Sequence, residues 1–503
     1  MKRSLNLDKL TRRAMLGLPS SHGGTEALVH PVSSPSLADA SVPVTRAIAR
    51  GESASGASDS LQIWITDKTR RVSAGEAIVW KPSSAPAADN AIVILPEHEQ
   101  QEILGFGAAF TDSACYLISK LTNVTRSQLF RKLFAPEEMN LNVCRICMGS
   151  SDCSTSVFSY DDGSVDPDLE RFSIAHDETY ILPILRDARA LNPDLFLFAS
   201  PWSPPGWMKS NGSMLGGCMR HTYMASYANY FLKFLRSYAA AGVPVQAVTI
   251  QNEVDTDQDG TMPACAWPQD YEADFVTMHL GPLLQRAGVS TKIWIVDHNY
   301  NLWGRAIGEL ETPDVRKYTN AIAWHGYEGK PEWIRRVQDA FPDAEMYWTE
   351  GGPDYKAPDY QTDWAKWGET FSSILRNCCR SLTVWTLLSN ERGQPYIGKG
   401  GSGVGGAILL DSNTQQFTYS GMFWALAHFS RFVRRGAIRI ESRSPSEEVL
   451  HCAFQNPDES IVVVLTNSGP ERSREVRLND RTAEVRLPAD SICTLLCPAL
   501  ART

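Results

Sequence analysis

Residues 195–202 read Leu-Phe-Leu-Phe-Ala-Ser-Pro-Trp, and the first five of them are apolar without a break. A strand with one face in water would alternate polar and apolar residues, so this run predicts a strand buried on both faces. Seven other short apolar runs are separated from it and from each other by stretches long enough for helices, such as the amphipathic segment 227–241. Eight buried strands with helix-length gaps predict an α/β fold, a (β/α)8 TIM barrel, over residues 101–435. The predicted strands are 105–110, 142–148, 195–202, 245–253, 292–298, 321–327, 345–352 and 381–388.

The end of the chain has a different pattern. Closely spaced, partly alternating runs with turn residues between them predict an attached antiparallel β-sandwich over 436–503, and residues 61–100 are expected to add strands to it. Residues 1–60 are rich in Ser, Ala, Gly and Pro and are expected to form a disordered N-terminal tail, since they cannot bury enough apolar surface to offset the cost of ordering.

Composition narrows the function classes. The 503 residues are 43% hydrophobic, and 48 Lys+Arg against 57 Asp+Glu give a net charge of −9. This excludes a wholly disordered chain and argues against nucleic acid or an anionic membrane as a partner. No apolar run approaches the roughly 18 residues of a transmembrane helix. Arg12-Arg13 faintly resembles a twin-arginine export signal, but only five apolar-type residues follow, so both a cytoplasmic and an exported location stay open. Oligomeric state is not indicated.

The eleven cysteines do not describe a small disulfide scaffold in a chain of this length. Cys144 and Cys147 have CxxC spacing, but in a strand they would face opposite sides, so buried free thiols are expected and a zinc or redox role is the weaker alternative. Residues 398–406 are Gly-rich without P-loop spacing, which favours a flexible loop over the barrel mouth. No metal and no cofactor are expected.

In an α/β barrel, chemistry takes place at the carboxyl ends of the strands. Two predicted strands, the fourth and the seventh, end in Glu253 and Glu350, which places two carboxylates across the barrel mouth from each other. One isolated Glu at a strand end is more often a structural ion pair or cap. A facing pair suits glycoside hydrolysis, with one carboxyl held protonated as general acid and the other ionised for attack on the anomeric carbon.

Tryptophan gives the second argument, because 12 of the 14 lie between Trp202 and Trp424. A flat aromatic ring covers the apolar face of a sugar while polar groups bind its hydroxyls. Trp202 and Trp207 lie on a Pro-stiffened loop after the third strand and are expected to form such a wall. Trp64, Trp80 and Trp294 are expected in the core, and Trp324 and Trp348 suit either place.

These residues carry a family resemblance. Six motifs in order resemble those of glycoside hydrolase family 30, the glucosylceramidase-like β-glycosidases: Gly105-Phe-Gly-Ala-Ala-Phe-Thr-Asp112, Ala199-Ser-Pro-Trp-Ser-Pro-Pro-Gly-Trp-Met-Lys209, Asn252-Glu253, His325-Gly-Tyr327, Thr349-Glu350 and Trp385. The resemblance covers residues 61–497 and implies a retaining barrel enzyme whose β-sandwich comes from both sides of the barrel.

The resemblance also implies roles. Glu253 would be the acid/base and Glu350 the nucleophile, with Arg145 and Tyr327 positioning Glu350. The implied substrate-binding residues are Asp152, Trp202, Asn252, His325, Tyr327, Trp385 and Asn390, with Arg145 and Trp207 in support. Two departures from the family pattern bear on the aglycone: Val254 follows Glu253 where the family usually has Pro, and Gly326 stands where glucosylceramidases tend to have an aromatic residue.

The leading hypothesis is therefore a retaining β-glycosidase acting on β-glucosides or a glucosylceramide-like glycolipid. The nearest alternatives keep the mechanism and change the substrate: β-1,6-glucanase, β-xylosidase or xylanase. A non-catalytic carbohydrate-binding protein on the same scaffold is less favoured, because both carboxylates and Asn252 are present.

Overall fold

The computed structural model describes residues 60–398, 403 and 405–499, which belong to one compact unit, Ser55–Thr503. The predicted tail 1–60 and the Arg12-Arg13 pair therefore lie outside the described residues, apart from Ser60, as does most of the predicted loop 398–406. No described helix is long and apolar enough to span a bilayer.

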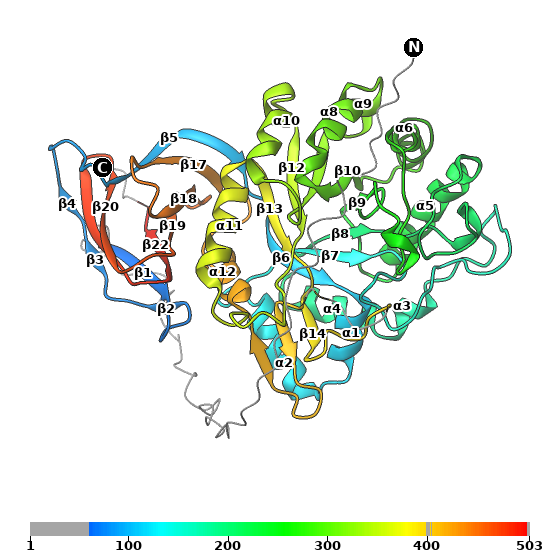
Figure 1. Cartoon of the computed structure of the whole chain (residues 1–503), viewed down its shortest axis with the longest axis horizontal. Helices are drawn as coiled ribbons and strands as arrows, with labels where there is room; N and C mark the ends of the chain where they lie inside the picture. The colour runs from blue at the N-terminus through cyan, green and yellow to red at the C-terminus, as the bar shows by residue number, and fades with distance from the viewer. Residues whose placement is uncertain (1–59, 399–402, 404, 500–503) are drawn as a thin grey trace, which may run out of the picture. The chain divides into compact units, whose positions relative to one another are not determined.

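A closed barrel of eight parallel strands confirms the predicted fold class (Figure 1). Each strand overlaps one of the eight predicted runs, although the fourth is much shorter than predicted. They are β6 (Gly105–Phe110), β7 (Val143–Cys147), β8 (Phe196–Ser200), β9 (Ala247–Thr249), β10 (Lys292–Asn299), β11 (Ala321–His325), β12 (Glu345–Glu350) and β13 (Cys379–Val384).

Helices follow the strands as in other α/β barrels. They are α1 (Asp112–Ser119), α2 (Asn123–Phe134), α3 (Ala175–Thr179), α4 (Ile181–Leu191), α5 (Met224–Ala240), α6 (Gln269–Asp274), α7 (Gly281–Arg286), α8 (Trp303–Glu311), α9 (Val315–Tyr318), α10 (Arg335–Ala340), α11 (Trp364–Arg376) and α12 (Gly421–Ser430). A small sheet of β14 (Leu388–Asn390), β15 (Ile408–Leu410) and β16 (Phe417–Tyr419) follows β13.

Side chains from six consecutive strands fill the barrel interior: Val143, Phe198, Ala247, Trp294, Ala321, Ala323 and Tyr347. Trp294 and Tyr347 stack with ring centroids 4.0 Å apart, so Trp294 is a core residue as expected. Gly107 in β6 is required by close approach, since a Cβ there would lie 1.9 Å from the Val143 carbonyl oxygen of β7. This interior is solid, and it leaves the carboxyl ends of the strands as the place for a site.

The remaining strands form a β-sandwich around a separate apolar core, as predicted. The first of these strands pairs with the last, β1 with β22, and Figure 1 shows these blue and red strands side by side. The strands are β1 (Ser60–Thr66), β2 (Ser73–Ala74), β3 (Ile78–Val79), β4 (Lys81–Pro82), β5 (Ile92–Glu102), β17 (Ile438–Arg443), β18 (Leu450–Gln455), β19 (Ile461–Asn467), β20 (Arg472–Leu478), β21 (Arg481–Leu487) and β22 (Ser491–Cys497).

Candidate active site

Glu253 and Glu350 meet at the mouth of the barrel. Glu350 is the last residue of β12, whereas β9 ends at Thr249, so the predicted fourth strand was too long and Glu253 lies in the loop that follows. Carboxylate oxygens of the two residues and a ring nitrogen of His325 lie within 4.8 Å of one another. Carboxyl groups of retaining glycosidases are about 5–5.5 Å apart, and those of inverting enzymes are at least about 6.5 Å apart. The spacing thus suits retention.

Arg145 forms an ion pair with Glu350. Its guanidinium is fully buried, and it donates to Glu350 Oε2, to Asn252 Oδ1 at 2.7 Å and to Asp297 Oδ2 at 2.7 Å. Tyr327 donates its hydroxyl to the other Glu350 oxygen at 3.2 Å. Both oxygens of Glu350 are therefore oriented by donors, which fixes the direction in which the carboxylate points.

Asp297 is the centre of this network, and no role was predicted for it from the sequence. Burial alone would raise its pKa, but the charge of Arg145 and the contacts with His325 and Thr349 lower it well below the usual range. Its two carboxylate oxygens accept from Arg145, Ser200, Thr249, His325 and Thr349. Asp297 thereby connects β7, β8, β9, β11 and β12 through one buried charge.

Glu253 is surrounded by side chains that can donate hydrogen bonds to its carboxylate. His298 Nε2 is 3.3 Å and His325 Nδ1 3.4 Å from Glu253 Oε1, and Gln258 donates to Oε2. Burial would raise the pKa of Glu253, but the contacts with His298 and His325 outweigh burial and lower it. Glu253 also has a positive φ of 56°, a conformation that costs a non-glycine residue of order 1–3 kcal/mol and is common at functional sites.

Asp152 provides an unused acceptor. It is buried, and its Oδ1 has no hydrogen-bond partner among the described residues. Burial, then the charges of Glu350 and Glu253, raise its pKa to about 7. Asp112 holds the neighbouring backbone in place, accepting from the Thr155 amide at 2.6 Å. A buried carboxyl oxygen without a donor is costly, so Oδ1 suits a ligand hydroxyl.

Trp202 and Trp385 are buried and do not form the exposed aromatic wall that was expected. Trp202 and Trp385 stack with ring centroids 4.9 Å apart, and the Arg145 guanidinium lies 4.6 Å from the Trp202 ring. Each indole is only 2% exposed, so it can offer an edge but not a free face. Trp207 does not join this pair: it is buried against Tyr223 and its Nε1 donates to a backbone carbonyl, which corrects the expectation of a second sugar-facing indole.

Other expected residues have structural partners. The Asn390 side chain accepts from the amides of Arg392 and Gln394 and so closes its own turn. A Cβ at Gly326 would lie 3.0 Å from Trp348 Nε1, which explains the missing aromatic residue at this position. Trp324 and Trp348 belong to the core.

Among the described residues, the Cys144 thiol and the carboxylate cluster at the barrel mouth do not suit a metal ion. All eleven cysteines are free thiols, and burial raises the pKa of Cys144 to about 12, which keeps it protonated and unfit as a zinc ligand. Glu253, His325 and Glu350 are the described residues whose ligand atoms cluster most like a metal site. The buried Arg145 cation already binds Glu350 there, and it would repel a metal ion.

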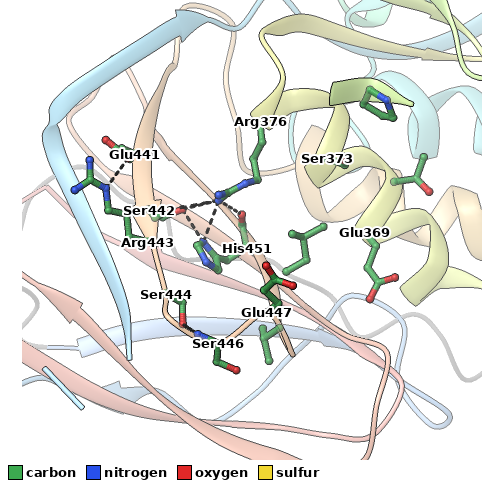
Figure 2. A pocket seen from close by; sticks show the side chains of 14 residues that line it. Glu369, Ser373, Arg376, Glu441, Ser442, Arg443, Ser444, Ser446, Glu447 and His451 are labelled. Carbon is green, nitrogen blue, oxygen red and sulfur yellow. Dashed lines mark hydrogen bonds and ion pairs between the residues drawn. The ribbon is translucent and has the colours of Figure 1, made fainter. Parts of the chain in front are cut away.

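A cavity of about 850 Å³ lies elsewhere, between α11 and the strands β17 and β18 (Figure 2). Arg376 in its wall donates to the His451 carbonyl at 3.0 Å and contacts Ser442. Burial and then the charge of Arg376 lower the pKa of His451 to about 4, so this histidine is neutral near pH 7. These polar groups join a barrel helix to the sandwich, and none of the candidate catalytic residues lines the cavity.

Comparison with known proteins agrees with this geometry. The family model described as the glycosyl hydrolase family 30 TIM-barrel domain matches residues 103–433, and the family 30 beta sandwich domain matches 436–495. The chain belongs to glycosyl hydrolase family 30. It is a glycoside hydrolase acting on β-glycosidic bonds, and cleavage with retention is typical of its family.

Relatives within family 30 differ in what their names say they cleave. The endo-1,6-beta-D-glucanase of Neurospora crassa is 32% identical over 68% of this chain and 72% of its own length. The lysosomal acid glucosylceramidase of Mus musculus is 30% identical over 76% of this chain and 78% of its own length. The crystal structure of SrfJ from Salmonella typhimurium superposes with a TM-score of 0.83, at 28% identity, over 88% of this chain and all of that one.

Proposed function

We propose that Glu350 is the nucleophile and Glu253 the acid/base of a two-step retaining hydrolysis. The observation that carries this proposal is the approach of their carboxylate oxygens to within 4.8 Å. Glu350 attacks the anomeric carbon while Glu253 protonates the leaving oxygen. Glu253 then takes a proton from water, whose oxygen releases the sugar from Glu350.

The charges around the two residues support this assignment over its reverse. Glu350 accepts hydrogen bonds from a guanidinium and a phenol, which hold it in one position as a nucleophile requires. Glu253 contacts imidazoles that can exchange protons with it. We assign the glycone side to Asp152 and Asn252, because Asp152 has a free acceptor and the Asn252 amide nitrogen can donate to the sugar 2-hydroxyl while its oxygen accepts from Arg145.

For the leaving group, we propose a hydroxyl-rich alcohol, such as the next glucose of a β-1,6-linked glucan, in preference to ceramide. Glu253 is flanked on this side by polar groups from Asp255, Gln258 and His298. A lipid would need an exposed apolar surface beside the carboxylates. Of the large apolar side chains that are well exposed in the described chain, Tyr327 is the one that belongs to this site.

A substrate panel tests the proposal. Gentiobiose and β-1,6-glucan are compared with glucosylceramide and an aryl β-xyloside, and NMR identifies the first-formed anomer, which should be β. Faster turnover of glucosylceramide than of both β-1,6-glucosides would refute the leaving-group assignment, and an α first product would refute retention.

Two variants test the roles. Glu350→Gln should lower kcat by about 1,000-fold or more, which corresponds to an activation free energy higher by about 4 kcal/mol. Glu253→Gln should impair gentiobiose but spare the first step with 2,4-dinitrophenyl β-glucoside, whose leaving group needs no proton. Glu471→Gln, at a surface ion pair with Arg486, is the matched control and should leave activity unchanged. Undiminished gentiobiose hydrolysis by either active-site variant would overturn its assigned role.

A further inference from the structure

His298 lies between two carboxylates at the edge of the site. Its Nε2 is 3.3 Å from Glu253 Oε1, and its Nδ1 is 2.6 Å from Asp255 Oδ1. Both contacts are ion pairs by distance, and His298 Nδ1 has no hydrogen-bond partner among the described residues. The His298 side chain is 10% exposed, whereas that of Asp255 is 41% exposed. The histidine therefore links a buried carboxyl group to one that reaches solvent.

An irregularity in β10 puts His298 there. Neighbouring residues of a regular strand face opposite sides, so Asp297 and His298 could not both serve the barrel mouth. The pairing of β10 with β11 shifts register between Val296 and His298, and φ is 73° at Val296 and 44° at Asp297. Positive φ is strained for a β-branched residue such as Val296.

Two hydrogen bonds hold this strained segment. The Val296 amide donates to Glu272 Oε1 at 2.9 Å, and the Glu253 amide donates to the Asp297 carbonyl at 3.0 Å. Glu272 is in turn ion-paired with Arg305 at 2.7 Å. The chain thus maintains an unfavourable backbone that keeps His298 against Glu253, which is the mark of a functional constraint.

The charged and titratable groups around His298 come from three elements: the loop after β9, β11 and α8. Burial would lower the pKa of His298, but its contacts with Asp255 and Glu253 raise it to about 10. The groups that face it are Glu253 and Asp255 in direct contact, His325 with its ring centroid 5.7 Å away, and Arg305, whose charge acts on Asp255. The neutral amide of Asn299 lies 3.4 Å from Nε2.

We propose that His298, clamped by Asp255, stores the proton that Glu253 delivers to the leaving group. This rests on the acid/base role proposed above for Glu253. The proton moves from His298 Nε2 to Glu253 Oε1 and from there to the leaving oxygen as the glycosidic bond breaks, which leaves the imidazole neutral. In the second step Glu253 takes a proton from the attacking water and returns it to His298, so each cycle balances.

The relay answers a difficulty in the chemistry. A sugar alcohol is a poor leaving group that must be protonated, yet Glu253 among two imidazoles has a lowered pKa and is ionised near neutral pH. A strongly interacting pair titrates as a unit, and Glu253 with His298 retains one proton far above the range of a lone carboxyl group. His298 is thus a positioning residue that acts through Glu253.

The pH profile of kcat/KM on gentiobiose distinguishes this role from simple electrostatics. In His298→Gln the stored proton is lost, so the alkaline limb should move to lower pH by about one unit or more. If His298 acted only through its positive charge, its removal would raise the pKa of Glu253 and move the limb to higher pH. A shift to higher pH, or no shift, overturns the proposal.

Two further variants keep the test decisive. Asp255→Asn, at a more exposed position that folding tolerates, should move the limb in the same direction by a smaller amount. His221→Asn removes a surface histidine 3.6 Å from Asp274 and should leave the profile unchanged. Titration of the His298 ring by ¹⁵N NMR should show the imidazolium persisting above pH 8 in the parent protein and losing its proton at lower pH in Asp255→Asn. A ring that is neutral at pH 8 overturns the relay.

Leaving-group dependence separates this proposal from the proposed function. His298→Gln should lose about 10–100-fold in kcat/KM on gentiobiose and remain within about threefold of the parent on 2,4-dinitrophenyl β-glucoside. Equal losses on both substrates would mean damage to the glycone site and would overturn the relay alone. Failure of the parent protein to hydrolyse any β-glucoside would instead overturn the proposed function.

Discussion

Replacing Arg145 by methionine tests how much of the barrel's stability depends on the buried charge network. The guanidinium is fully buried and ion-pairs with Asp297 and Glu350, both of which are themselves nearly inaccessible. Methionine keeps most of the side-chain volume and removes the cation, so two buried carboxylates lose their counter-charge. Breaking a buried ion pair by removing one partner costs about 3–5 kcal/mol.

That cost converts to a change in melting temperature. Unfolding entropy of about 2.1 cal/mol/K per residue gives about 0.7 kcal/mol/K for a barrel spanning residues 103–433. The expected decrease in Tm, measured by scanning calorimetry on the full chain at pH 7, is therefore about 4–7 °C. Arg131→Met is the matched control, because Arg131 is 71% exposed and pairs with Glu137 on the surface. It should change stability by no more than about 0.5 kcal/mol.

The Tm deficit of Arg145→Met should also depend on pH. In the parent protein the folded pKa of Asp297 lies below its unfolded value of about 3.9, so its stabilising contribution is complete above that pH and is lost as pH falls toward the folded pKa. In Arg145→Met, burial acts with less opposition and raises the folded pKa of Asp297. The variant should therefore regain part of its lost Tm between pH 7 and pH 5. A deficit below about 1 kcal/mol, or one that does not shrink on acidification, would refute the view that Arg145 compensates buried charge.

Three further predictions follow from single contacts. Gly107→Ala should yield insoluble or strongly destabilised protein in an expression and Tm assay, because the new Cβ overlaps the Val143 carbonyl. Gly304→Ala is the control: its Cβ meets nothing within 4 Å on a helix, so it should be neutral or stabilising by up to about 1 kcal/mol. Asp152→Asn should raise KM for β-glucosides about 10–100-fold and abolish the dependence of KM on pH near 7, and an unchanged KM would remove Asp152 from the glycone site. Lys209→Met leaves two buried backbone carbonyls and a serine hydroxyl without their donor and should cost about 1–3 kcal/mol in a Tm assay without changing the pH profile of kcat/KM.

The barrel was predictable because its signal is local. Runs such as 195–199 are apolar on both faces, and each of the eight runs overlaps a barrel strand, although the fourth covers only Ala247–Thr249. The sandwich was less predictable where pairing partners lie far apart in the chain. The strand β5 contains Pro96 and an exposed polar stretch, Glu97 to Gln100, and it is a strand because β17 and β20 pair with it. No local pattern contains that information.

Some residues of the candidate site could likewise be predicted from the sequence, and others could not. Strand-end position pointed to Glu350, the family resemblance pointed to Arg145, and the structure brings the two together. Asp297 and His298 are the last two residues of the predicted strand 292–298, and no role was predicted for either. A period of two allows only one of them to face the barrel mouth, and the register shift at Val296 that admits both depends on Glu272, an acceptor on another element. The signal that could have found them is the pair of adjacent polar residues after an apolar run.

The charge balance of the network depends on His325, which lies 3.1 Å from Asp297 and 3.8 Å from Glu350. In the free protein Arg145 faces both Asp297 and Glu350, so whenever His325 is neutral this part of the site carries an excess negative charge. An oxocarbenium-like transition state brings positive charge to that place and is favoured by the excess. When Glu350 becomes a glycosyl ester in the proposed mechanism, it loses its charge, and Arg145 and Asp297 remain as a balanced pair. The network is therefore matched to the transition state more closely than to the ground state, which is the condition for catalysis.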